Sequence, residues 1–162
     1  MRESLDFALA RGAEPLAEIV SYAGTSDGVH FTAPDETAVQ AARAIRRALE
    51  KGGIHPDDVD YINAHATSTP VGDPHEVRAY RQAFGDRPLP ISSTKSTTGH
   101  MLGAAGAVAA IWCAQALREG LLPPTINYHT PDPHCELDCV PDTARQAPFS
   151  IALSSAFGFG GH

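Results

Sequence analysis

The strongest amphipathic pattern in the chain lies at residues 35–51 and predicts a helix. Gly52 and Gly53 follow it and predict its end, because glycine readily adopts the left-handed backbone of a helix C-cap. The apolar side of this helix is formed by Ala38, Ala41, Ala42, Ile45, Ala48 and Leu49. A second helix is predicted at 100–116, where His100 opens it. Its many alanines and glycines let other backbone approach closely, which favours a central position.

Shorter patterns predict the remaining elements. A helix end is expected at 4–12 and a further helix at about 73–84. The predicted strands are 16–22, 59–64, 89–93 and 150–154. Residues 121–148 contain six prolines and are expected to be loop-rich. The alternation of strands and helices predicts an α/β fold, with helices on the faces of a sheet.

Three residues that can take part in chemistry or binding come directly after predicted strands. His65 follows 59–64, Lys95 follows 89–93, and Phe157 comes shortly after 150–154. Ligands of α/β sheets gather at the carboxyl ends of the strands. The placement therefore predicts a functional site at one edge of the sheet.

Composition narrows the class of protein. The chain has 162 residues, enough for one domain over 1–162, and its 43% hydrophobic and 19% charged residues are typical of a soluble globular protein. The net charge of −7 offers no basic footprint for nucleic acid, and we interpret the basic residues at 43–51 as a solvated helix face.

Two further features bear on localisation. The weakly polar run at 101–117 is too short for a membrane span, and no secretory leader is visible at the N-terminus. The three cysteines, Cys113, Cys135 and Cys139, are an odd number in a chain without such a leader. This favours reduced thiols and a cytoplasmic protein.

Two polar stretches stand out, at residues 63–70 and 93–106. A histidine at a strand end beside hydroxyl residues can donate a hydrogen bond to a carbonyl or act as a general acid or base. Taken alone, His65 is more often a hydrogen-bonded structural histidine. A second histidine, His100, with Lys95 five residues before it, favours a functional role. At a helix N-terminus the dipole would favour a neutral His100 imidazole.

These stretches resemble the His-Gly-Thr-Ser-Thr-Pro and Lys-Ser-x-x-Gly-His motifs of the β-ketoacyl-acyl-carrier-protein synthases. Residues 157–161 resemble the Phe-Gly-Phe-Gly-Gly segment of the same family. All three occur in the family's order and at about its spacing. The resemblance covers nearly the whole chain and is closest to the elongating, type II branch.

The resemblance implies the C-terminal half of a thiolase-like α/β fold, with a mixed sheet and helices on its faces. The implied reaction is a decarboxylative Claisen condensation between an enzyme-bound acyl thioester and malonyl-acyl-carrier protein. No cofactor is implied, since phosphopantetheine of the acyl-carrier protein holds the substrate. The implied partners are that carrier protein, an N-terminal half with the catalytic cysteine, and a second copy in a homodimer.

Roles for single residues also come from the resemblance. His65 and His100 would stabilise the enolate formed on decarboxylation, and Lys95 would orient them. The phosphopantetheine arm would contact Thr67 and Thr69. The ring of Phe157 would act as a gate between the acyl pocket and the malonyl site, with Phe159 in the same substrate-binding segment.

The chain departs from the family in four respects. None of its cysteines lies in a strand-to-helix elbow, so the nucleophile is expected in the other half. Where the family's helix carries a glutamate that pairs with the lysine, this chain has Ala109, so Lys95 should have a lowered pKa or another partner. Ala66 replaces a glycine, although alanine tolerates positive φ poorly. Both ends of the chain look truncated.

Other interpretations remain open. A zinc site could use residues with ligand-type side chains, namely His129, His134, Cys135 and Cys139, but their spacing is weak and we expect no metal. The chain could instead be a non-catalytic partner of the chain-length-factor type. The missing partner of Lys95 at position 109 is compatible with this interpretation, whereas the presence of both histidines and Lys95 argues against it. A third alternative is an inert fragment whose helix at 100–116 is poorly covered.

Overall fold

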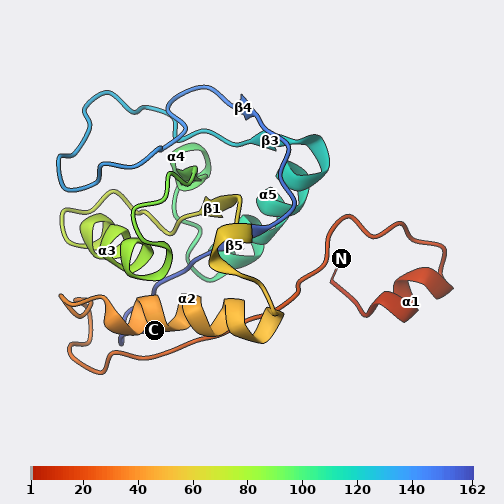
Figure 1. Ribbon diagram of the computed structural model, residues 1–162, viewed down its shortest axis with the longest axis horizontal. Coiled ribbons are helices and arrows are strands. Elements are labelled where there is room, and N and C mark those ends of the chain that lie inside the picture. The colour runs from red at the N-terminus through yellow and green to blue at the C-terminus, as the bar shows by residue number, and fades with distance from the viewer. Residues whose placement is uncertain (1) are drawn as a thin grey trace.

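The computed structural model describes residues 2–162 and has a small parallel sheet at its centre (Figure 1). The sheet order is β2-β1-β5, and both pairings are parallel. The strands are β1 (Tyr61–Asn63), β2 (Ile91–Ser92) and β5 (Ala152–Ser154). Helices cover both faces of this sheet, so the α/β prediction is confirmed.

Successive residues of β1 point to opposite faces of the sheet, as the pleat of a strand requires. Ile62 packs into a cluster with the helices α2 (Val39–Gly52) and α3 (Gly72–Phe84). Tyr61 packs into a second cluster with Cys113 of α5 (Ala105–Glu119). The sheet therefore lies between α2 and α3 on one side and α5 on the other.

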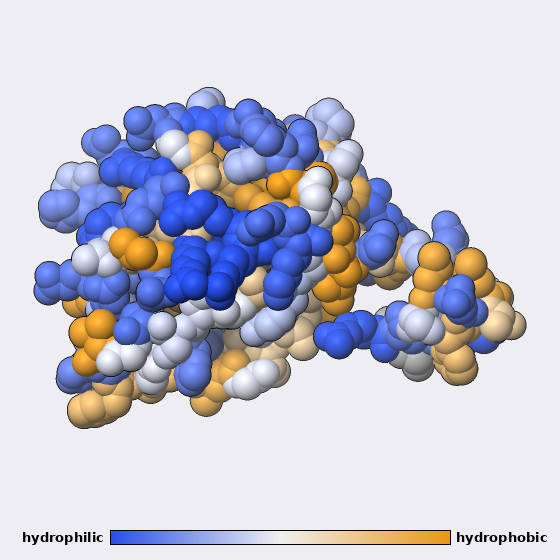
Figure 2. All heavy atoms as spheres, turned by 60° about the horizontal axis from the view of Figure 1, so that its bottom comes forward, coloured by the Kyte–Doolittle hydropathy of each residue, from blue (hydrophilic) through white to orange (hydrophobic). Residues whose placement is uncertain are grey.

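The helix predicted at 35–51 is present as α2, and its predicted apolar side is the buried side. Ala41, Ala42, Ile45 and Leu49 are buried, and Gly53 ends the helix with φ 63°. It begins at Val39 rather than at residue 35, because Ala38 has the left-handed φ of 58°. The basic residues of α2 are exposed, on the hydrophilic face that Figure 2 shows.

The prediction of a strand at residues 16–22 is wrong. The segment is extended but forms no ladder, and Ile19 is 61% exposed. Side chains hold it beside α2 instead, since the Ser21 hydroxyl donates to Ala48 O at 2.6 Å. Before it, α1 (Leu5–Ala10) lies apart from the body with exposed apolar side chains (Figures 1 and 2).

The helix predicted to open at His100 begins five residues later. The short helix α4 (Lys95–Thr98) ends at Gly99, whose φ is 72°, and the 3₁₀ turn η2 (Leu102–Ala104) precedes α5. Left-handed backbone at Gly99 and at Leu102, with φ 49°, interrupts the helix. His100 therefore lies in the connection between α4 and η2.

The proline-rich segment is mostly irregular, but two-residue strands β3 (Leu121–Leu122) and β4 (Arg145–Gln146) form an antiparallel ladder in it. The pattern missed them because two residues carry no periodicity. Another short element is the 3₁₀ turn η1 (Pro56–Asp58). Within residues 2–162, no helix has both the length and the apolar character needed to cross a bilayer.

We expect Ile45→Ala to lower the free energy of unfolding by about 2–4 kcal/mol, because it removes a buried branched side chain and leaves a cavity. Urea unfolding at pH 7 measures the loss. The control is Arg47→Ala on the exposed side of the same helix, with an expected change of about 0.5 kcal/mol or less. Equal losses in the two variants would contradict the assignment of the buried face.

Candidate active site

The carboxyl ends of the three parallel strands meet at one edge of the sheet and bring the predicted residues together. Rings of His65 and His100 lie edge to face with centroids 5.4 Å apart, and the Phe157 ring lies 5.8 Å from His65. Below them, the Asn63 amide bridges two strand ends by donating to Tyr61 Oη and to Thr94 Oγ1. The structure thus brings His65, His100 and Phe157 together at the edge of the sheet where the sequence predicts a site.

The local environment keeps His65 neutral. Burial lowers the pKa of His65 to about 4, and the positive charges of Lys95 and His100 act in the same direction. Its Nδ1 atom is buried and has no hydrogen-bond partner among the described residues. The neutral imidazole therefore has one buried polar atom whose hydrogen-bonding capacity is unused within the described residues.

A buried carboxylate, Glu76, holds the backbone of the His65 loop, and none of the sequence motifs indicated it. Oε1 accepts a hydrogen bond from His65 N at 2.8 Å, and Oε2 accepts one from Ala66 N at 2.7 Å. The hydroxyls of Tyr80 and of Ser155 also donate to Oε1. Burial raises the pKa of Glu76, and these hydrogen bonds oppose the increase. The signal was a glutamate on the buried side of the helix predicted at 73–84.

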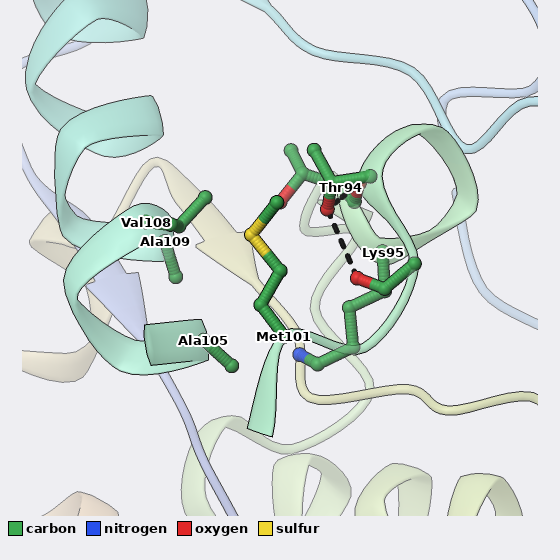
Figure 3. A pocket seen from close by; sticks show the side chains of 8 residues that line it. Thr94, Lys95, Met101, Ala105, Val108 and Ala109 are labelled. Carbon is green, nitrogen blue, oxygen red and sulfur yellow. Dashed lines mark hydrogen bonds between the residues drawn. The ribbon is translucent and has the colours of Figure 1, made fainter. Parts of the chain in front are cut away.

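The same carboxylate acts on Lys95, the residue left without its expected partner by Ala109. Burial lowers the pKa of Lys95, as expected, while the charge of Glu76 raises it. Ala109 and Lys95 line a narrow pocket of about 10 Å³, room for a single water. In Figure 3 the Met101 side chain extends between Thr94 and the helix that carries Ala109.

The predicted position of His100 at a helix N-terminus is wrong, since this residue precedes α5 by five positions and the dipole of α5 does not act on it directly. The backbone orients its ring instead: Leu102 N donates to Nδ1 of His100 at 3.2 Å. When the ring is neutral, its proton is therefore on Nε2, which can donate to a substrate.

The loop after His65 combines unusual backbone with capping of α3. Ala66 has φ 21°, so the structure places alanine at a positive φ, where Glu76 fixes its N–H. The hydroxyl of Thr69 accepts from Gly72 N at 3.0 Å, at the start of α3. A Cβ atom at Gly72 would lie 2.5 Å from that hydroxyl, so a larger residue there would force the Thr69 side chain to move. Thr67 is half-buried beside His65.

The C-terminal segment brings one predicted residue into the site. The ring of Phe157 lies between His65 and His75, with its centroid 5.6 Å from that of His75. Phe159 is 78% exposed and forms no ring contact with the described residues.

The cysteines and the possible zinc ligands are elsewhere. Burial raises the pKa of Cys113 to about 12 and that of Cys135 to about 11, so neither is a thiolate at neutral pH. Burial also raises the pKa of Cys139. Among residues 2–162, no three His, Cys, Asp or Glu side chains are placed to hold a metal ion.

Comparisons with known proteins agree on one family. Residues 16–129 match the family described as "Beta-ketoacyl synthase, C-terminal domain". A 3-oxoacyl-[acyl-carrier-protein] synthase 2 of Staphylococcus aureus is 49% identical over 99% of this chain and 40% of its own length. The chain thus spans about two fifths of the curated relatives it matches.

Solved structures agree as well. The ishigamide ketosynthase/chain length factor superposes with a TM-score of 0.94 and 42% identity, over 98% of this chain and 39% of that one. A ketosynthase of a type II polyketide synthase, in complex with its acyl-carrier protein, gives a TM-score of 0.93 and 38% identity, over 98% of this chain and 40% of that one.

We expect His65 to remain neutral down to about pH 5, because its pKa is lowered to about 4. The unfolded chain takes up this proton first as the pH falls below the ordinary value of 6.5, so His65 should contribute a loss of stability between pH 6.5 and 4. Histidine resonances in ¹H–¹⁵N spectra report the titration. In His65→Asn, urea unfolding should show a smaller decrease over that range. A midpoint near 6.5 for His65 would contradict the burial argument.

Replacing Glu76 with glutamine should destabilise the protein by about 3 kcal/mol, because an amide NH₂ would face a backbone N–H donor in a buried site. The measurement is urea unfolding at pH 7, with the exposed Glu50→Gln as the matched control. A loss of stability no larger than that of the control would mean that Glu76 does not hold the His65 loop.

Proposed function

Because the chain belongs to the β-ketoacyl synthase family, as its C-terminal domain, we propose that it supplies the histidine and lysine side of a condensing site. The TM-scores above 0.9 also confirm the thiolase-like α/β fold. The proposed reaction is a decarboxylative Claisen condensation in fatty-acid or polyketide chain elongation. The observation that carries the proposal is the edge-to-face pair of His65 and His100 beside Lys95.

In the proposed reaction, the malonyl thioester oxygen lies between the two histidines. The bond from the malonyl carbon to its carboxylate breaks, carbon dioxide leaves, and the electron pair forms an enolate. Hydrogen bonds from the N–H groups of His65 and His100 stabilise the charge on the enolate oxygen. The enolate carbon then attacks the acyl thioester, and the cysteine thiolate leaves.

Lys95 supports this step through its charge. Burial lowers the pKa of His65, and the ammonium group of Lys95 lowers it further, so that His65 acts as a neutral hydrogen-bond donor. The same positive charge stabilises the negative charge that develops on the enolate. Burial lowers the pKa of Lys95, and the charge of Glu76 limits this decrease and so favours the charged ammonium.

The substrate arrives on the phosphopantetheine arm of an acyl-carrier protein, and no cofactor is required. Thr67 and Thr69 would contact this arm, since they lie on the loop that begins at His65. Phe157 would gate the passage from the acyl pocket to the malonyl site, with Phe159 in the same segment. The exposed Phe159 would contact the substrate only when this segment moves.

The cysteine would come from an N-terminal half. One face of α5 buries Ala109, Cys113 and Ala116, while Ile111 on another face is 61% exposed. An N-terminal half would cover this apolar surface, and two copies of the complete enzyme would form a homodimer in the cytoplasm.

A non-catalytic partner of the chain-length-factor type is the second candidate. A ketosynthase/chain length factor is among the similar solved structures, and Ala109 allows this function. Both histidines and Lys95 are retained at the site, which favours catalysis.

Decarboxylation of malonyl-acyl-carrier protein tests the proposal, with the chain assembled with an N-terminal half that carries the cysteine. His65→Ala and His100→Ala should each lower the rate about 10²–10³-fold, because each removes a donor to the enolate oxygen. His55→Ala is the control, since His55 is exposed at the start of η1, and it should leave the rate unchanged.

Unchanged decarboxylation in both site variants would exclude the proposed roles. An assembled wild-type protein that decarboxylates nothing would favour the chain-length-factor alternative. The chain alone should not condense substrates, and condensation without the N-terminal half would disprove the assignment of the nucleophile.

A further inference from the structure

Phe157 lies between two imidazoles, and only one of them belongs to the proposed reaction. We infer that His75 is a positioning residue whose ring packs against Phe157 and holds it against His65. We call the site between the two imidazoles the seat of Phe157, and the His75 ring its outer wall. The inference rests on the proposed function for its effect on catalysis, but the seat itself is a feature of the packing.

The geometry of the three rings carries the inference. The Phe157 centroid is 5.8 Å from that of His65 at 81° and 5.6 Å from that of His75 at 84°. Such edge-to-face contacts are the favourable arrangement of aromatic rings. His75 is 5% exposed, and within residues 2–162 its ring makes no side-chain hydrogen bond, so packing on Phe157 is its specific contact.

The surroundings of His75 favour the uncharged form of its ring. Burial lowers its pKa, and so does the charge of Arg78, while Asp35 and Asp27 act in the opposite direction. The residue also lies near the N-terminus of α3, where the helix dipole disfavours a cation. A neutral imidazole packs beside the phenyl ring without the cost of burying a charge.

The backbone on both sides of Phe157 is anchored by hydrogen bonds. On one side, Ser155 is fixed, since its N–H donates to Asn63 O and its hydroxyl to Glu76. On the other side, Gly160 N donates to Phe31 O at 2.8 Å. Between these anchors, Phe157 alone has a side chain that is not exposed. Within the span, Gly158 N also donates to His162 O at 2.8 Å. The Phe157 ring packs against the core cluster as well as against the two imidazoles, so it is the side-chain contact that holds this span.

The seat has a consequence for the reaction. A seated Phe157 ring covers one side of His65 and keeps water from it. When the ring leaves, an enolate formed at His65 can take a proton from water, which yields acetyl-acyl-carrier protein and carbon dioxide without condensation. Removing the outer wall should therefore increase uncoupled decarboxylation relative to condensation.

Three variants of the assembled protein test the inference. His75→Ala removes the wall and should raise the ratio of acetyl-acyl-carrier protein to condensation product about fivefold, as expected for a gate that opens more often. His75→Phe restores an aromatic ring and should return the ratio to within about twofold of wild type. Val77→Ala is the matched control, since Val77 is also buried on α3, and it should leave the ratio unchanged. An unchanged ratio in His75→Ala, or an equal increase in Val77→Ala, would overturn the inference.

A second measurement separates this inference from the proposed function. In protein labelled with 4-fluorophenylalanine, ¹⁹F spectra report the surroundings of each ring, and Phe157→Leu identifies the Phe157 signal. His75→Ala should move that signal toward the position of the exposed Phe159, and Val77→Ala should leave it in place. A Phe157 signal unaffected by His75→Ala would exclude the seat whatever the activity. If the signal moves but wild-type protein decarboxylates nothing, the seat is supported and the proposed function fails.

Discussion

The buried carboxylate of Glu76 is the interaction on which the geometry of the site depends. A charge without water is costly unless hydrogen bonds surround it, and here four donors converge on two oxygens. They come from the loop after β1, from α3 itself and from the segment after β5. Because all of these elements must reach the same carboxylate, His65 and the Phe157 segment are fixed relative to one another. The same hydrogen bonds hold Ala66 at its unfavourable φ.

Two kinds of feature could be predicted from the sequence. One is a helix whose apolar side chains recur over several turns, and the other is a polar residue that directly follows an apolar strand. The helices at 35–51 and 73–84 and the strand-end positions of His65 and Lys95 are of these kinds. Residues 16–22 have the alternation of a strand, but a strand also needs a hydrogen-bonded neighbour, which a local pattern cannot reveal. The start of α5 was misplaced because the left-handed Leu102 leaves no signal in an apolar run.

The site could be predicted in outline, but not its electrostatics. Sequence motifs indicated both histidines and the lysine. The family pattern places the carboxylate that pairs with Lys95 at position 109, where this chain has alanine. The carboxylate comes from a different helix, because packing of α3 on the sheet brings Glu76 under the strand ends. For the same reason, the contact between His75 and Phe157 could not be predicted, since it joins residues distant in sequence through their rings alone.

The open side of α5 links folding to assembly. This helix packs on the sheet through small side chains and leaves Ile111 in water. In the proposed enzyme, a partner that covers this surface binds the folded chain and not the unfolded one, so by mass action the midpoint of unfolding rises with the concentration of that partner. Stability then belongs to the pair rather than to either half, and a change at the surface of α5 alters the amount of folded protein even when every residue of the site is intact.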